Sequence, residues 1–157
     1  MIGDVQLRQV RVGDPEVAPL LQGLTEEYQR RYGDTSEMNS VDAQEFEPPD
    51  GAFLVLLEGG ATVAGGGLRR LSDDSCEVKR MWTAPNQRRR GHASALLSAL
   101  EAEARDRGYS YLRLETGPAQ PEARSLYQRR GYRVIPPYGK YDVATAFELL
   151  LDSEDAP

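Results

Sequence analysis

The chain contains one cysteine, Cys76, and one histidine, His92, among its 157 residues. A single cysteine excludes a disulfide bond within the chain and is typical of a reducing compartment, so we expect a cytoplasmic location. Structural and catalytic zinc sites are built from clusters of cysteine and histidine, so this scarcity also predicts that no metal is bound. The fold is therefore expected to rely on its apolar core.

Long apolar runs and an excess of positive charge are absent as well. No segment approaches the ~20 apolar residues that a membrane span needs, and residues 1–11 lack the apolar centre of a signal peptide. The net charge is −6 and the sequence pI is about 4.9, whereas nucleic-acid binding requires a basic surface. We expect neither a membrane nor a nucleic acid as a partner. The acidity itself fits simple solubility as well as attraction of a cationic substrate.

The composition is that of one soluble globular domain. Hydrophobic residues make up 39% of the chain and charged residues 28%, which is typical of soluble domains. The length suits a single core. We expect one domain over residues 1–151, followed by an acidic tail over residues 152–157.

Hydrophobic periodicity predicts an alternating order of strands and helices. Strands are expected over residues 5–11, 52–57, 61–71, 76–83, 109–115, 132–136 and 144–151. Helices are expected over residues 14–33, 94–107 and 122–130, the first with Asp14 as its N-cap and Pro15 at its first position. A short helical turn is expected near residues 42–46. The strand–helix–strand unit of residues 76–115 requires one parallel pair within an otherwise antiparallel sheet.

The turn between the fourth strand and the second helix carries the clearest functional signal. Residues 88–94 read Arg-Arg-Arg-Gly-His-Ala-Ser. A turn that opens a helix after a strand exposes backbone N–H groups at the positive end of the helix dipole, and these groups bind phosphates. Gly91 lets a ligand approach the backbone closely. The segment predicts a site for a phosphate-bearing ligand, and a solvated basic loop is the alternative.

Two motifs resemble those of the GNAT superfamily of N-acetyltransferases. The spacing Arg88-x-x-Gly91-x-Ala93 resembles the Q/R-x-x-G-x-G/A motif with which that family binds the pyrophosphate of acetyl-CoA. Downstream, residues 114–117 (Leu-Glu-Thr-Gly) and 121–132 (Pro-Glu-Ala to Gly-Tyr) resemble the family's LETG and PEA..LY...GY segments. The resemblance covers about residues 52–149.

The resemblance implies an α/β (α+β) fold of the GNAT type. Its central sheet is mixed and mostly antiparallel, helices cover both faces, and one parallel strand pair splays apart to admit the pantetheine arm of the cofactor. It also implies an acetyl-CoA-dependent N-acetyltransferase that needs no metal. We expect direct transfer, in a ternary complex, to the primary amine of a small molecule. Many members of the family are dimers, so a homodimer is a further expectation.

The same resemblance implies where the cofactor binds. The pyrophosphate is expected on Arg88, Arg89, Arg90, Gly91, His92, Ala93 and Ser94, and the pantetheine along Met81, Trp82 and Thr83. Gln120 is the nearest counterpart of an asparagine that contacts the pantetheine in the family. The His92 side chain is expected at the surface rather than in catalysis. Cys76 is expected to be a packed small hydrophobic residue, since no His–Asn or His–Asp partner pattern accompanies it.

Acetyl transfer from a thioester to an amine needs a group that protonates the thiolate and one that accepts the amine's proton. Tyr127, four residues before Gly131-Tyr132, resembles the tyrosine that points at the cofactor sulfur in many members of the family. The resemblance implies that it is the general acid, and a phenol pKa near 10 suits a thiolate leaving group. Its alternative is a purely structural place in the core. Glu77 is expected to be the general base by resemblance to histone-type members. Its alternatives are an ion pair with Lys79 and a water chain that replaces the base.

The resemblance implies that the acceptor site lies between the first helix, the loop after it and the C-terminal strands. The residues proposed to line it are Glu26, Glu27, Tyr28, Tyr32, Tyr138 and Tyr141. Carboxylates with aromatic rings suit a cationic amine. The alternative is a helix surface with pairs four residues apart, Glu26 with Arg30 and Glu27 with Arg31.

Three other functions compete with a small-molecule acetyltransferase. The acceptor could be a protein N-terminus or a lysine, which would need an open groove for an extended peptide. A non-catalytic CoA-binding module is disfavoured because Tyr127 is present. A nucleic-acid-binding module is disfavoured by the acidity and by the lack of aromatic residues within the run of residues 88–90.

Overall fold

The computed structural model describes residues 4–117, 121–139 and 143–151, so the tail expected over residues 152–157 lies outside the described part. Within those ranges, seven strands form one sheet in the order β1-β2-β3-β4-β5-β7-β6. The strands are β1 (Val5–Val10), β2 (Ala52–Glu58), β3 (Ala61–Arg70), β4 (Ser75–Thr83), β5 (Tyr111–Thr116), β6 (Arg133–Ile135) and β7 (Thr145–Leu150). The α-helices are α1 (Ala18–Tyr32), α2 (His92–Asp106) and α3 (Pro121–Arg129). Shorter 3₁₀ turns cover Pro15–Val17, Ser36–Asn39, Ala43–Phe46 and Pro85–Gln87.

The predicted parallel pair is confirmed, and it is short. β4 and β5 run parallel, whereas the other neighbouring strands are antiparallel. Their pairing covers three residues of each strand, from Ser75 opposite Tyr111 to Glu77 opposite Arg113. Beyond Glu77 the two strands separate. The sheet is therefore mixed and splayed, as the predicted fold requires.

A bulge in β4 accompanies this separation. Gly65 of β3 lies opposite Trp82 and Gly67 lies opposite Lys79, so β4 places two residues where β3 has one. Arg80, one of these two, has a φ of +65°. A bulge bends the strand that carries it and increases its twist. β4 thus turns away from β5 where their pairing ends.

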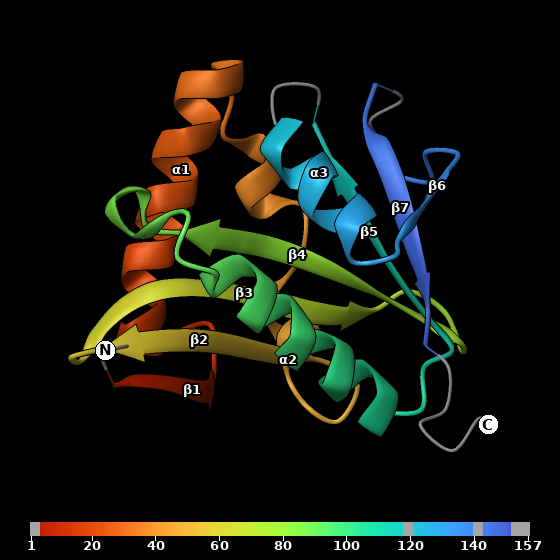
Figure 1. The fold of residues 1–157 in the computed structure, drawn as a ribbon, viewed down its shortest axis with the longest axis horizontal. Helices are drawn as coiled ribbons and strands as arrows, with labels where there is room; N and C mark the ends of the chain where they lie inside the picture. Colours follow the sequence, from red (N-terminus) through yellow and green to blue (C-terminus); the bar gives the residue numbers. More distant parts are fainter. Residues whose placement is uncertain (1–3, 118–120, 140–142, 152–157) are drawn as a thin grey trace.

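Helices cover both faces of the sheet (Figure 1). α2 and α3 lie on one face, where Leu96, Leu97 and Leu100 of α2 pack in one core with Leu112 and Phe147 of the sheet. α1 lies on the other face. Its apolar side chains Leu20 and Leu24, together with Val17 of the preceding 3₁₀ turn, are buried in a second core around Trp82.

The predicted elements are found within a few residues of their expected ends, with local corrections. Asp14 does not cap a helical N–H group: its carboxylate accepts from the backbone N–H of Arg11 at 2.9 Å, which closes the turn after β1. β5 begins at Tyr111 rather than at residue 109, because the backbone N–H of Tyr109 still bonds to Ala104 O of α2 at 3.1 Å. The expected end of α1 is confirmed, with Gly33 in the left-handed conformation. Within the described ranges, no helix is long and apolar enough to cross a membrane.

The close approach of α1 to β4 predicts that Gly23→Ala destabilises the protein. A Cβ at Gly23 would lie 2.3 Å from Trp82 Nε1 and 2.6 Å from Trp82 Cε2. Alanine favours a helix by ~1 kcal/mol over glycine, but overpacking a core costs ~1–3 kcal/mol. We expect a net fall in the free energy of unfolding, measured by urea denaturation.

Gly13→Ala is the matched control, because no described heavy atom lies within 4 Å of a Cβ at Gly13. That variant should equal the wild type or exceed it by ~0.5 kcal/mol through a more restricted unfolded chain. Equal stability losses in the two variants would contradict the tight packing of α1 on Trp82.

Candidate active site

A cavity of about 900 Å³ opens where β4 and β5 diverge. Its walls come from α1, β4, β5, α3 and the start of α2. The predicted residues that line it are Glu27, Tyr28, Tyr32, Glu77, Met81, Trp82, Thr83, Arg88, Arg89, Gly91, His92, Ala93, Ser94 and Tyr127. Glu26, Arg90 and Tyr138 are not among its lining residues, and Gln120 and Tyr141 lie outside the described residues. One cavity therefore joins three predicted parts of the site: the turn of residues 88–94 (the phosphate turn), the expected general acid Tyr127, and α1, the helix expected to line the acceptor site.

The start of α2 has the geometry of an anion site. Gly91 has a φ of +82° and is the N-cap of α2. The first bond within the helix runs from Ala95 N to Gly91 O at 3.0 Å, so the amides of residues 92–94 precede it and have no carbonyl four residues earlier within the helix. No described heavy atom lies within 4 Å of a Cβ built at Gly91. The turn thus offers backbone donors and space for a phosphate.

The three arginines of the turn differ in their contacts. Arg88 donates to Glu27 Oε1 at 3.0 Å and to Thr83 O at 3.3 Å, so it ties the turn to α1. Arg90 turns to Glu58, with Nη2 at 3.3 Å from Oε2. Arg89 lines the cavity and is exposed. Of the three, Arg89 is the arginine best placed to meet an anion.

His92 corrects the expectation of a surface side chain, because it is only 8% exposed. It is the first residue of α2, which begins there rather than at residue 94. Its ring is therefore part of the cavity wall, and its buried Nε2 has no hydrogen-bond partner among the described residues.

Within the described ranges, no group of three or more His, Cys, Asp or Glu side chains is arranged to hold a metal.

A buried ionic network fixes α3 on α2. Arg130 donates to Glu101 Oε1 at 2.7 Å, to Ser94 Oγ at 3.0 Å and to Ser98 Oγ at 2.8 Å. The Tyr132 hydroxyl donates to Glu101 Oε2 at 2.8 Å. Ser94 belongs to the phosphate turn, so the network holds that turn and the helix of Tyr127 in one arrangement.

Tyr127 is both a core residue and a wall of the cavity. Its side chain is buried, with ring centroids 5.7 Å from Tyr132 and 5.4 Å from Phe147. Burial, and then the neighbouring Tyr28, raise the pKa of the Tyr127 phenol above its usual value. No hydrogen bond to its hydroxyl is found among the described residues. A structural role in the core and a role as general acid are therefore compatible for Tyr127, because core packing fixes the ring that lines the cavity.

α1, the helix expected to line the acceptor site, brings Tyr28 into the same cavity. Burial, and then the nearby Glu37, raise the pKa of the Tyr28 phenol to about 12. Tyr28 and Tyr32 lie with ring centroids 6.2 Å apart. The expected pair of Glu27 with Arg31 is also present, at 3.4 Å. Glu26 instead accepts from Gln22 at the exposed side of the helix.

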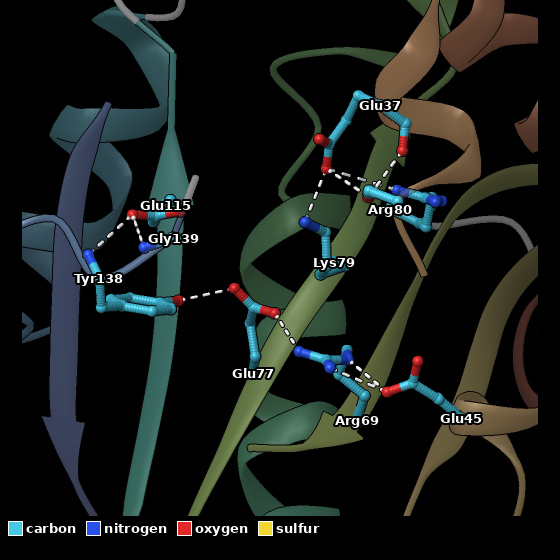
Figure 2. A network of polar contacts seen from close by, with 10 residues as sticks. Glu37, Glu45, Arg69, Glu77, Lys79, Arg80, Glu115, Tyr138 and Gly139 are labelled. Carbon is cyan, nitrogen blue, oxygen red and sulfur yellow. Dashed lines mark hydrogen bonds and ion pairs between the residues drawn. The ribbon is translucent and has the colours of Figure 1, made fainter. Parts of the chain in front are cut away.

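Glu77 is held at both of its oxygens (Figure 2). Oε1 accepts from Arg69 at 2.8 Å and Oε2 accepts from the Tyr138 hydroxyl at 2.8 Å. The alternative of a Glu77–Lys79 ion pair is wrong, since Lys79 pairs with Glu37 at 2.6 Å. The physical reason is the sheet register, which places Arg69 of β3 directly opposite Glu77.

Glu115 lines the cavity and was not among the predicted site residues. Its Oε2 accepts from the backbone N–H groups of Tyr138 at 3.2 Å and Gly139 at 3.1 Å. Leu112 and Leu114 of β5 are buried in the core under α2 and α3, so Arg113 and Glu115 face the opposite side. This alternation was the sequence signal that could have found Glu115.

A splayed parallel pair, a helix start with free backbone donors and a tyrosine on the facing helix are the features expected of an acyltransferase of the acyl-CoA type. The model of the acetyltransferase (GNAT) family matches residues 19–132, and the chain belongs to this family. Its members are N-acetyltransferases that use acetyl-CoA, so the protein is an acyltransferase.

Individual relatives agree with this assignment. An IAA acetyltransferase from Azospirillum brasilense is 36% identical over 122 residues, which are 75% of this chain and 80% of that protein. A crystal structure of a candidate acyl-CoA N-acyltransferase from Klebsiella pneumoniae is 26% identical, with a TM-score of 0.77, and the match covers 94% of this chain and 98% of that one. The PaiA N-acetyltransferase from Thermoplasma acidophilum, solved in complex with coenzyme A, has the same fold at 15% identity, with a TM-score of 0.72 over 94% of this chain and 99% of that one.

The burial of Cys76 predicts that the native protein does not react with Ellman's reagent. Cys76 is fully buried, and burial raises the pKa of its thiol to about 12. At pH 8 the thiol is therefore protonated and inaccessible, and both conditions prevent attack on a disulfide reagent. We expect one reactive thiol per chain only after denaturation. Rapid reaction of the native protein at pH 8 would contradict this placement.

Proposed function

We propose that the protein transfers an acetyl group from acetyl-CoA directly to the primary amine of a small molecule in a ternary complex. The observation that carries the proposal is the single cavity that joins the start of α2, Tyr127 and the carboxylates of the facing wall. Its volume of about 900 Å³ falls in the range of small-ligand sites, ~300–1,000 Å³. Both substrates can therefore meet without a covalent enzyme intermediate, because the thioester is already activated.

The cofactor end of the cavity is built mainly from backbone. The amides of residues 92–94 and the Arg89 side chain are proposed to bind the pyrophosphate. Beyond Glu77, β4 has no β5 partner in the described sheet, so the peptide groups at Met81 and Thr83 can pair with the amides of the pantetheine arm. The Trp82 side chain packs under Gly23 of α1, so only its backbone is proposed to serve this purpose.

Tyr127 is proposed to protonate the departing thiolate. Its raised pKa keeps the phenol protonated across the neutral range, which is the state that a general acid needs. The ring contacts with Tyr132 and Phe147 fix the ring, which lines the cavity. The buried Arg130–Glu101 pair keeps this helix fixed relative to the phosphate turn.

Glu77 is proposed to take up the amine's proton through Tyr138. The Tyr138 hydroxyl occupies Oε2 of Glu77, so direct contact between that oxygen and an amine is blocked. A phenol can accept a proton from the ammonium while it donates its own proton to the carboxylate. Burial, and then Glu77 itself, raise the pKa of Tyr138, so the phenol stays protonated and ready to donate.

A small acceptor is favoured by the contacts of the loop after β6. Tyr138 and Gly139 are bonded through their backbone to Glu115, and Tyr138 is bonded through its side chain to Glu77. These bonds join the loop after β6 to β4 and β5. A loop bonded to both Glu77 and Glu115 leaves more room for a compact amine than for an extended peptide. The name of the Azospirillum relative, an acetyltransferase of IAA, gives further support.

Turnover of acetyl-CoA with a panel of amines tests the proposal. The panel should hold polyamines, amino acids, aminoglycosides and peptides with free N-termini or lysines, with product mass as the readout. We expect acetylation of one small-amine class. Acetylation of peptides alone would replace the proposed acceptor with a protein, and an acetyl-enzyme isolated after gel filtration would contradict direct transfer.

Gly91→Glu is the negative control for this panel. It places a negative charge and a side chain at the phosphate turn, in a backbone conformation with a φ of +82° that side chains disfavour. Acetyl-CoA binding, followed by calorimetry, should be lost together with turnover. Unchanged affinity would remove the start of α2 from the cofactor site.

Tyr127→Phe should lower kcat by ~100-fold or more, as loss of a general acid typically does. The packing of the ring is kept, so the Kd for acetyl-CoA and the stability should change little. Turnover equal to that of the wild type, in steady-state kinetics with the accepted amine, would assign Tyr127 to the core alone.

A further inference from the structure

Opposite charges face each other across the gap between β4 and β5 (Figure 2). If the parallel pairing continued past Glu77 and Arg113, Lys79 would lie opposite Glu115. Both side chains would share the face turned away from α2. The splay keeps them apart, and each finds another partner: Lys79 bonds to Glu37, and Glu115 bonds to the loop amides. The cavity between them therefore has a basic wall and an acidic wall.

Within the described residues, the two cations of the basic wall, Lys79 and Arg80, share the carboxylate of Glu37. Glu37 Oε2 lies 2.6 Å from Lys79 Nζ and 3.7 Å from Arg80 Nη1. The Arg80 side chain is only 4% exposed. Its Nη2 donates to Met38 O at 3.0 Å, but its buried Nη1 has no hydrogen-bond partner among the described residues. A buried donor of this kind is costly unless an acceptor reaches it, so the wall is suited to a second anion.

The acidic wall is Glu115, which has no ion pair among the described residues. Its Oε2 accepts both loop amides, and its Oε1 has no bonded donor in the described part of the chain. Glu77 differs, because Arg69, which it shares with Glu45, pairs with its Oε1, and Tyr138 occupies its Oε2. Of these two carboxylates, Glu115 is thus the one that retains both a charge and an oxygen for a ligand.

We propose that the acceptor is an amino acid, that is, a primary amine that carries its own carboxylate. Its ammonium group binds Glu115 Oε1 beside Tyr138, and its carboxylate binds Lys79 Nζ and Arg80 Nη1. This inference rests on the proposed acetyltransferase function and names its substrate class. A diamine would bring a second cation to the Lys79–Arg80 wall, and an amine without a carboxylate would leave Arg80 Nη1 without an acceptor.

The test compares matched acceptors with the wild-type protein. Each α- or ω-amino acid is assayed beside its amide and its decarboxylated amine, so that only the carboxylate differs. A charged hydrogen bond at a closed site corresponds to about tenfold or more in affinity. We expect kcat/KM for the best amino acid to exceed that of its amide and its amine by at least that factor.

Two variants test the basic wall and the acidic wall separately. Lys79→Met should lower kcat/KM about tenfold for the amino acid and leave its amide unchanged, so the amide also reports that the variant is folded. Glu115→Gln keeps an oxygen for the loop amides but loses the charge, so it should slow the amino acid and the amide alike. Arg70→Met is the matched control, since Arg70 of β3 pairs with Asp50 and Asp73 outside the cavity.

The outcomes distinguish this inference from the proposed function. Equal turnover of amino acids, amides and decarboxylated amines would overturn the inference and leave the acetyltransferase function intact. Equal losses on the amino acid and its amide in Lys79→Met would also overturn it. No turnover with any amine, although acetyl-CoA binds, would overturn the proposed function and this inference with it.

Discussion

Opposite Gly66 of β3, β4 carries two residues, Arg80 and Met81, and Arg80 adopts a left-handed conformation to accommodate the extra one. Such a conformation costs ~1–3 kcal/mol in a residue other than glycine, so the surrounding contacts must hold it. The bend ends the pairing of β4 with β5 after Glu77. The cavity, the unpaired peptide groups of β4 and the separation of Lys79 from Glu115 all follow from this irregularity.

Buried carboxylates then determine which basic residues remain for ligands. Glu101, Glu77 and Glu148 are each about 5% exposed, and each is paired with at least one arginine: Arg130, Arg69 and Arg113 respectively. A buried carboxylate without such a partner would be strongly destabilising. These arginines are structural for that reason. Arg89, Lys79 and Arg80 line the cavity instead, and Lys79 and Arg80 share the carboxylate of Glu37.

The sequence predicted the order of the elements, the parallel pair and the phosphate turn because each has a local signal: a periodicity, a glycine position or a motif spacing. It failed where the deciding partner is distant in sequence. Residue spacing suggested a pair of Glu77 with Lys79, but strand register gave Glu77 to Arg69. His92 was expected at the surface, but the start of α2 places it in the cavity wall.

The amino-acid sequence by itself determined the fold class, because backbone preference and hydrophobic pattern act within a few residues. It also determined the family resemblance, because the motifs that contain Gly91 and Tyr127 can be recognised from residue spacing alone. Only the tertiary structure decided which side chains carry unbalanced charge. Glu37, Glu77 and Glu115 are chemically alike in the sequence, yet they meet two cations, an arginine with a phenol, and two backbone amides. The net charge at a site depends on residues that folding brings together, so no local pattern in the sequence predicts it.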